Sequence, residues 1–203
     1  MSDNKIAIVN YEVGNILSIQ RCLEKINCKS YLISNPNDLD DFDKIILPGV
    51  GRFDYVMNKL NDLGFSEKLL KKNKHKARIL GICVGMQVFF ESSEESIKTA
   101  GLCFIKGRVK KILINSNIKA PHIGWNKVYM NKENNLSNKY YYFVHSYSAI
   151  PQDQKIITGF AYYGNNKITS SIKFQNLFGT QFHPEKSSTS GLDYLNYFIK
   201  NNE

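Results

Sequence analysis

The chain has 203 residues, 42% of them hydrophobic, which is enough for one buried core and few for two, so we expect a single domain over residues 1–203. Its formal net charge of +9 is spread among acidic residues, and the one basic run, at 71–76, stands where a surface helix should end, so we expect no nucleic-acid partner. The four cysteines lack metal-ligand spacing and no apolar run approaches the roughly 18 residues of a membrane span, so we expect a cytoplasmic protein without a membrane anchor, metal or other cofactor.

The first half of the chain predicts a parallel sheet with intervening helices. Apolar runs typical of strands buried on both faces occur at 5–10, 29–34 and 44–47. After the first run, Asn15 is a candidate N-cap, and apolar residues recur at helical spacing as far as Ile26. The segment 53–74 predicts one helix and a second short one, interrupted by Gly64. This alternation indicates an α/β domain that begins with a βαβ unit.

A glycine-rich loop, Pro48-Gly49-Val50-Gly51, follows the third strand directly. Its two glycines allow backbone geometries that are closed to other residues. At the carboxyl end of a parallel strand, such a loop can present backbone N–H groups to an oxyanion. The alternative is that it serves only as a tight connection between strand and helix.

The stretch from Arg78 to Gln87 predicts a strand, a sharp Gly-x-Cys-x-Gly turn and a helix that we expect to run to the charged residues at 91–95. Glycines two residues before and after Cys83 match the nucleophile elbow, a strained turn that lifts one side chain above a sheet. A helix that begins at Cys83 directs unpaired N–H groups at the sulfur and favours the thiolate. The alternative is a buried structural cysteine between packing glycines.

From Gly101 onward the pattern becomes extended, and the chain closes with a predicted helix at 191–199. Strand-like segments occur at 102–114, 123–130, 140–150, 155–163 and 167–174, with a polar loop at 131–138 and a hairpin-type turn at 164–166. We therefore expect an antiparallel segment that completes or flanks the parallel sheet.

His183 and Glu185 stand at the end of the last apolar run. Residues two apart on a strand face the same side. His183 can then reach the thiol with one ring nitrogen while Glu185 accepts from the other, as a triad of nucleophile, base and orienting acid requires. His145 is the competing base, but it has no carboxylate at close sequence range. We therefore predict a Cys83-His183-Glu185 triad.

Six motifs in this order resemble the class I, or triad, glutamine amidotransferases; they lie at 10–15, 47–53, 81–87, 121–126, 142–147 and 181–188. The elbow and His-Pro-Glu are shared across that family. Pro-Gly-Val-Gly, His-x-Gly-Trp-Asn and His-Pro-Glu-Lys-Ser are similar to its subfamily of glutaminase subunits of imidazole glycerol phosphate synthase. The resemblance implies a flavodoxin-like three-layer α/β/α domain with an added antiparallel strand segment.

The resemblance also implies roles for residues around the predicted triad. It places the oxyanion site at Val50, Gly51 and Val84. It assigns L-glutamine binding to Gly49, Gln87, Glu95, His145, Ser146 and Tyr147. It directs a partner-facing surface to Tyr11, Asn15, His122, Trp125 and Lys186. From the residues alone, Glu95 could equally be a solvated carboxylate at a helix end, and Trp125 could be a core residue.

The function implied is hydrolysis of glutamine to glutamate and ammonia, with the ammonia passed to a HisF-type cyclase subunit in a heterodimer that serves histidine biosynthesis. One alternative keeps the chemistry but feeds a different synthase, such as one that amidates a sugar of a surface polysaccharide. A catalytically silent interaction module is disfavoured by the intact triad residues. Glu12, Arg52 and Val84 depart from the family pattern. Because a free glutaminase would waste glutamine, we expect the loop Gly49-Val50-Gly51 to couple activity to the partner.

Overall fold

The computed structural model describes residues 5–113, 119–131 and 135–200. Its strands are β1 (Lys5–Val9), β2 (Lys29–Ile33), β3 (Lys44–Leu47), β4 (Arg78–Ile82), β5 (Ser92–Ser93), β6 (Ser96–Ala100), β7 (Gly107–Lys111), β8 (His122–Met130), β9 (Lys139–His145), β10 (Tyr147–Pro151), β11 (Ile157–Tyr163), β12 (Asn166–Phe174) and β13 (Leu177–Thr180). Its helices are α1 (Ile16–Lys25), α2 (Phe53–Asp62), α3 (Phe65–Lys74), α4 (Val84–Gln87) and α5 (Ser188–Lys200), with 3-10 turns η1 (Pro36–Asp41), η2 (Gln154–Ile156) and η3 (Pro184–Lys186). Within these ranges no helix is long and apolar enough to cross a membrane.

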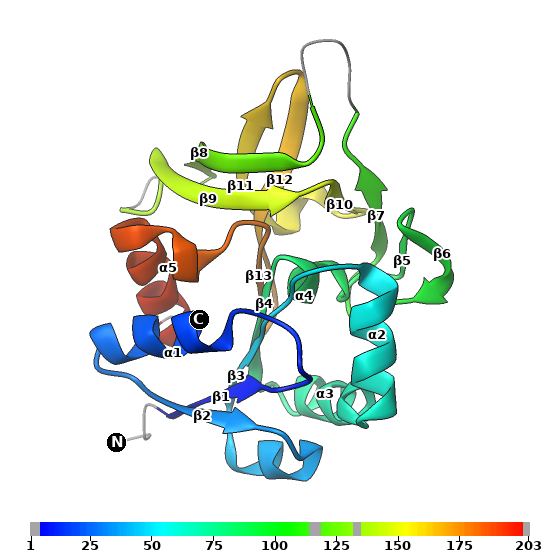
Figure 1. Ribbon diagram of the computed structural model, residues 1–203, viewed down its shortest axis with the longest axis vertical. Coiled ribbons are helices and arrows are strands. Elements are labelled where there is room, and N and C mark those ends of the chain that lie inside the picture. The colour runs from blue at the N-terminus through cyan, green and yellow to red at the C-terminus, as the bar shows by residue number, and fades with distance from the viewer. Residues whose placement is uncertain (1–4, 114–118, 132–134, 201–203) are drawn as a thin grey trace.

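The parallel half of the large sheet has the order β2-β1-β3-β4-β13, and all neighbouring pairs in it run parallel. Its central strands are buried on both faces, as their continuous apolar runs predict. Helices α1 and α5 cover one face and α2 and α3 cover the other (Figure 1). The predicted three-layer α/β/α architecture is confirmed, with the strand order of flavodoxin-like folds.

The antiparallel half extends the same sheet through β12, β11, β8 and β9, while β10, β7, β5 and β6 form a second, smaller sheet. The prediction of one strand over 140–150 is wrong. The chain leaves β9 at His145 and enters β10 at Tyr147, because β9 pairs with β8 whereas β10 pairs with β7. Ser146 therefore lies at the crossing between the two sheets. Of the strand predicted at 102–114, only β7 is formed. Ile114 and part of the loop at 131–138 lie outside the described residues.

The helix after Cys83 is much shorter than predicted. Helix α4 ends at Gln87, because the backbone carbonyls that would continue it accept from a returning segment. Leu102 N donates to Val88 O at 2.7 Å, and Ile105 N donates to Phe89 O at 3.0 Å. The charged residues at 91–95 consequently form β5 and the turn into β6. The predicted pair of helices over 53–74 is confirmed, with Gly64 in the left-handed conformation between them.

Candidate active site

Cys83 stands at the sharp turn between β4 and α4. Its φ of 54° and ψ of −110° lie in a region that non-glycine residues rarely adopt, as the elbow requires. The glycines on either side are needed for close backbone contact. A Cβ on Gly81 would stand 2.4 Å from the Gly85 carbonyl oxygen, and one on Gly85 would stand 2.1 Å from the Leu47 carbonyl oxygen. The Gly-x-Cys-x-Gly pattern thus packs the elbow onto the end of β3.

The loop after β3 lies against this elbow. A Cβ on Gly49 would stand 2.2 Å from the Gly85 nitrogen, so this end of the loop is fixed by packing. Gly51 is different: its φ is +92°, and a Cβ there would meet nothing within 4 Å. The buried hydroxyl of Tyr11 donates to the Pro48 carbonyl oxygen just before the loop. The loop is therefore anchored at 48–49 and has free space at Gly51.

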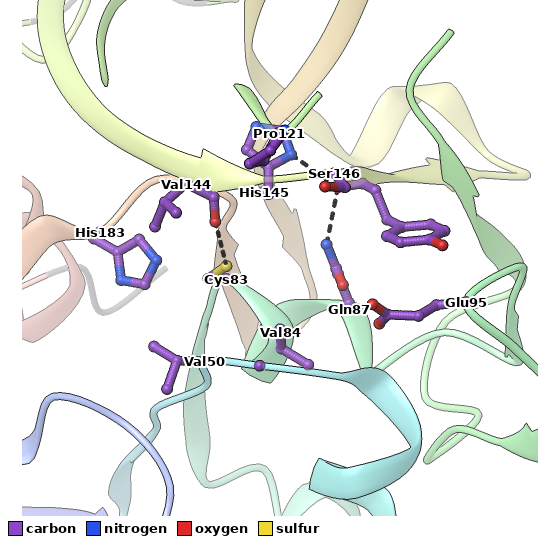
Figure 2. Close-up of a pocket in the computed structure, with 12 residues that line it drawn as sticks. Val50, Cys83, Val84, Gln87, Glu95, Pro121, Val144, His145, Ser146 and His183 are labelled. Carbon is purple, nitrogen blue, oxygen red and sulfur yellow. Dashed lines mark hydrogen bonds between the residues drawn. The ribbon is translucent and has the colours of Figure 1, made fainter. Parts of the chain in front are cut away.

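Glu95 joins the turn between β5 and β6 to the start of α2. Its Oε2 accepts from Phe53 N at 2.8 Å, which satisfies one of the N–H groups left unpaired at a helix N-terminus. The carboxylate also lines the cavity in front of Cys83 (Figure 2). The alternative of a solvated carboxylate at a helix C-terminus is therefore wrong, because no helix ends there.

Two residues that depart from the family pattern form ion pairs at the surface near the loop at 48–51. Arg52, the residue before α2, pairs with Asp54 at 2.9 Å. Glu12 pairs with Lys59 of α2. Exposed pairs of this kind contribute little to stability. Each pair includes one residue of α2, Asp54 or Lys59.

His183 and Glu185 meet behind the elbow. His183 Nδ1 lies 2.8 Å from Glu185 Oε1, and both side chains are only 1% exposed. The prediction that both residues face the same side of one strand is wrong, since β13 ends at Thr180 and Glu185 lies in the 3-10 turn η3. The turn is held by Ser187, whose Oγ donates to His183 O at 2.6 Å and accepts from Tyr142 N at 2.9 Å.

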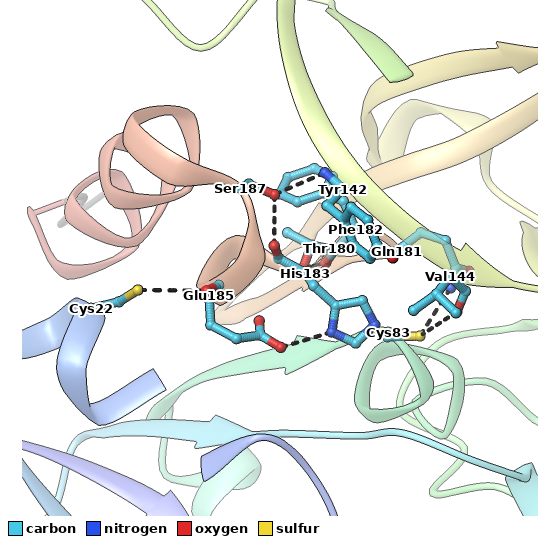
Figure 3. Close-up of polar contacts among 10 residues, drawn as sticks. All are labelled: Cys22, Cys83, Tyr142, Val144, Thr180, Gln181, Phe182, His183, Glu185 and Ser187. Atoms are coloured by element: carbon cyan, nitrogen blue, oxygen red, sulfur yellow. Dashed lines mark hydrogen bonds and ion pairs between the residues drawn. The ribbon is translucent and has the colours of Figure 1, made fainter. Parts of the chain in front are cut away.

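The second ring nitrogen of His183 faces the sulfur of Cys83 (Figure 3). This Nε2 is buried and has no hydrogen-bond partner among the described residues. Burial disfavours the charged ring, but the negative charge of Cys83, contact with its sulfur and the hydrogen bond to Glu185 outweigh it and raise the pKa of His183 to about 10. The raised pKa favours the protonated form of the imidazole beside the sulfur. Cys83, His183 and Glu185 thus have the order of contacts that a thiolate nucleophile, its acid and an orienting carboxylate require.

His145 belongs to a different chain of contacts. Its Nδ1 lies 2.8 Å from the Tyr147 carbonyl oxygen, so this nitrogen must carry the proton. Nε2 of His145 then accepts from His122 Nδ1 at 3.0 Å. His122 Nε2 in turn accepts from Asn126 Nδ2 at 3.3 Å. Burial lowers the pKa of His145 to about 3 and that of His122 to about 4. Both rings are therefore neutral at pH 7, and His145 does not compete as the base.

A cavity of about 250 Å³ opens in front of the sulfur (Figure 2), smaller than the roughly 300–1,000 Å³ typical of sites for drug-sized ligands. Most residues predicted from sequence to touch substrate or oxyanion line it: Val50, Gly51, Cys83, Val84, Gln87, Glu95, His145, Ser146, Tyr147 and His183. Gly49 does not line it, because its backbone packs onto Gly85. A cavity of this size suits a free amino acid.

The residues predicted at a partner surface divide into two groups. Tyr11 is fully buried and His122 is 3% exposed, so neither side chain offers contact surface, and this part of the prediction is wrong. His122 instead stacks between Phe143 and Tyr163. In contrast, Trp125 is 53% exposed, Asn15 is half-buried and Lys186 is exposed. For these three residues the partner contact stays a prediction.

Sequence reasoning missed three residues of the site. Pro121 and Val144 line the cavity, and the Gln181 side chain lies 3.6 Å from the sulfur. All three fall inside motifs that the sequence singled out, but no spacing rule indicates that they reach Cys83. In the described part of the chain no three His, Cys, Asp or Glu side chains gather as metal ligands do.

Comparisons with known proteins show the family to which this chain belongs. The family model for glutamine amidotransferase class-I matches residues 7–201. A solved structure described as a glutamine amidotransferase shares the fold with a TM-score of 0.76 over 95% of this chain and 97% of that one, at 13% identity. The structure of PurLQS from Thermotoga maritima does so with a TM-score of 0.72 over 96% and 97%, at 18% identity. The chain belongs to the class I glutamine amidotransferase family.

Relatives with higher sequence identity are subunits of one kind of synthase. The imidazole glycerol phosphate synthase subunit HisH of Pyrococcus furiosus is 43% identical over 96% of this chain and 98% of its own length. Subunit HisH 1 of Campylobacter jejuni strain RM1221 is 41% identical over 96% and 99%. The chain therefore spans nearly the whole length of these relatives.

Proposed function

We propose that this chain is the glutaminase subunit of an imidazole glycerol phosphate synthase, a HisH-type enzyme that hydrolyses L-glutamine and supplies ammonia to a cyclase subunit. The observation that carries the proposal is identity of about 40% to HisH subunits over nearly the full length of both chains. The site geometry supports it, because a thiol, a histidine and a carboxylate meet at a cavity that suits an amino acid. No specific feature favours an acceptor other than the cyclase.

In the acylation half of the reaction, the Cys83 thiolate attacks the side-chain amide carbon of glutamine. The negative charge moves to the amide oxygen, which accepts from backbone N–H groups of the loop at Val50 and Gly51 and from Val84 N, an amide that the start of α4 leaves unpaired. The protonated His183 gives its proton to the departing nitrogen. The carbon–nitrogen bond breaks, ammonia leaves, and a glutamyl thioester remains on Cys83.

In the hydrolysis half, the now neutral His183 removes a proton from water, which attacks the thioester carbon. The carbon–sulfur bond breaks, the electron pair returns to sulfur, and glutamate leaves. Glu185 keeps one orientation of the ring through both halves by accepting from Nδ1 at 2.8 Å. It steadies the imidazolium and does not itself transfer the proton.

Substrate binding would use the far side of the cavity from the triad. Glu95 presents the only carboxylate among the lining residues and can accept from the substrate ammonium. Ser146 stands where the chain crosses between sheets, so its position is fixed from both sides. Gln87 is 2% exposed and completes the wall between these groups and the sulfur.

The partner is a HisF-type cyclase subunit in a heterodimer, located in the cytoplasm, and the lyase activity belongs to that assembly. The exposed aromatic and aliphatic side chains on β8 and β9 offer a surface for it. Ile123, Trp125 and Tyr140 are each more than half exposed there, and Lys186 lies over the ring of Tyr142 nearby. Large apolar side chains that gather on one face of a soluble domain favour a protein partner.

The test is to combine the purified chain with the cyclase subunit encoded by the same organism and its ribonucleotide substrate. We expect a one-to-one complex by analytical ultracentrifugation and one glutamate released for each imidazole glycerol phosphate formed from glutamine. As a control, ammonium salts should support product formation by the cyclase alone. If neither a complex nor glutamine-dependent product forms while that control succeeds, the assignment of the acceptor is wrong.

A further inference from the structure

A line of side-chain amides runs beside the cavity from the Tyr147 carbonyl to the sulfur of Cys83. Gln87 Nε2 lies 3.0 Å from the Tyr147 carbonyl oxygen and 3.0 Å from Gln181 Oε1. Gln181 Nε2 lies 3.6 Å from Cys83 Sγ (Figure 3). Gln181 is fully buried and Gln87 nearly so. The last amide in the line therefore contacts the reacting atom out of reach of bulk water.

The orientation of both amides follows from their partners. A carbonyl oxygen only accepts, so Gln87 must turn its nitrogen toward Tyr147. The same nitrogen then directs its second N–H at Gln181, which must present its oxygen. The nitrogen of Gln181 is consequently left on the side of the sulfur. The Tyr147 carbonyl is itself fixed, because it also accepts from His145 Nδ1 at 2.8 Å.

We propose that Gln181 is a further catalytic residue, whose side-chain amide donates to the Cys83 sulfur and stabilises it as the thiolate; this rests on the proposed role of Cys83 as nucleophile. A donor contributes more to a charged acceptor than to a neutral one, so the contact favours thiolate over thiol. It acts twice in each turnover. It prepares the nucleophile before attack, and it stabilises the sulfur again when the carbon–sulfur bond breaks in hydrolysis.

The carbonyl oxygen of Val144 favours the thiol form of Cys83 and is the group that the Gln181 donor offsets. The Val144 carbonyl oxygen lies 3.9 Å from the sulfur and can accept from the thiol form, while its partial negative charge opposes the thiolate. His183 approaches from another side (Figure 3). Gln181 therefore adds a neutral donor that offsets Val144 without changing the charge of the site.

The role of the side chain can be separated from that of the backbone at Gln181, which follows the end of β13. Gln181 N donates to Ser170 O at 2.9 Å, and this backbone contact does not depend on the side chain. A role limited to packing predicts that an unbranched side chain of similar length would replace Gln181 without effect on the sulfur. A donor role predicts that the same replacement changes the protonation of the sulfur.

The experiment measures the rate at which iodoacetamide alkylates Cys83 between pH 5 and 9, quantified on its own peptide by mass spectrometry. We expect Gln181→Met to lower the rate at pH 7 by about tenfold and to move the half-maximal rate to higher pH. It should lower kcat for glutamine hydrolysis more than it changes KM. Gln152→Met, at an exposed glutamine, is the matched control and should leave the profile unchanged. Gln181→Asn, which withdraws the amide from the sulfur, should shift the profile in the same direction if the Met variant does not fold.

An alkylation profile of folded Gln181→Met or Gln181→Asn that coincides with wild type would overturn the inference. Cys83→Ala separates this result from the proposed function. If Cys83→Ala retains glutaminase activity, the nucleophile itself is wrongly assigned. If Cys83→Ala is inactive and the Gln181 variants keep the wild-type profile, only the role of Gln181 fails.

Discussion

The Glu185 carboxylate lies 2.8 Å from Nδ1 of His183 in a contact from which water is almost excluded. The two residues reach it through the 3-10 turn η3. Because Nδ1 must donate to the carboxylate, Nε2 is the nitrogen left to exchange protons with Cys83 and with substrate in the proposed mechanism. One short turn thereby fixes which nitrogen of the ring is reactive.

This relationship predicts that Glu185→Gln harms turnover less than His183→Ala. The glutamine oxygen can still accept from Nδ1, whereas removal of the imidazole eliminates the proton donor and acceptor. We expect His183→Ala to lower kcat by roughly 10²–10⁴-fold, the usual contribution of a general acid and base. Steady-state glutamate release in the assembled complex measures both variants. Wild-type rates in both would refute the triad.

The charge state of His183 should depend on Cys83. The negative sulfur is the largest of the influences that raise the pKa of His183 to about 10, while burial opposes them. Loss of the sulfur in Cys83→Ala should therefore lower that pKa, so that the ring loses its proton at a lower pH in the variant than in wild type. An NMR titration of the ring Cε1–H gives the result, with the exposed His75 as internal control. An unchanged His183 titration in Cys83→Ala would contradict the proposed pairing.

Buried neutral histidines should make the protein acid-sensitive. The folded chain holds the pKa of His122 near 4 and that of His145 near 3, below the ordinary value of 6.5, because burial disfavours their charged forms. The unfolded chain then binds more protons below pH 6.5. Stability from these residues is complete above pH 6.5 and is lost as the pH falls toward about 4 and 3.

Urea unfolding at pH 7 and pH 4.5 measures this dependence. His122→Gln should reduce the fall in unfolding free energy between the two pH values, because one buried titrating group is removed. His75→Gln, at an exposed histidine, should leave the fall unchanged. An equal effect of the two substitutions would show that burial of His122 is not the cause.

Sequence patterns gave the parallel half of the fold because its signals are local. Each buried strand is a short apolar run, and the elbow is specified by Gly81 and Gly85, which no other residue can replace at those backbone contacts. Cys83 and His183 could be paired because both follow apolar strands whose carboxyl ends meet at one sheet edge.

Other features depend on contacts between distant segments. Helix α4 is short because the segment 101–105 donates hydrogen bonds to the carbonyls of Val88 and Phe89, just after the helix. Nothing within 83–95 indicates these contacts. The break at Ser146 arises because β9 and β10 join different sheets. Tyr11 and His122 belong to motifs that resemble a partner surface, but burial is a tertiary property that motif spacing does not reveal.

The asymmetry of the loop at 48–51, the proposed oxyanion site, predicts control by the partner. Gly49 is packed against Gly85, whereas Gly51 has open space and a φ of +92°. We therefore expect rotation at the peptide between Val50 and Gly51. One misdirected oxyanion N–H costs about 10²–10³-fold in turnover. We expect the isolated chain to release glutamate at least two orders of magnitude more slowly than the complex with cyclase and acceptor, through a population shift of this loop. Full activity in the isolated chain would contradict the control by the loop and leave the triad intact.

We propose above all that Cys83 is the nucleophile that releases ammonia for a separate acceptor site. The most direct measurement is product formation by the complex that contains Cys83→Ala, with glutamine or with ammonium salts as the nitrogen source. We expect glutamine-dependent formation to be abolished while ammonia-dependent formation stays at the wild-type rate, because the substitution removes the nucleophile and leaves the acceptor site untouched. Glutamine-dependent activity within tenfold of wild type would contradict it.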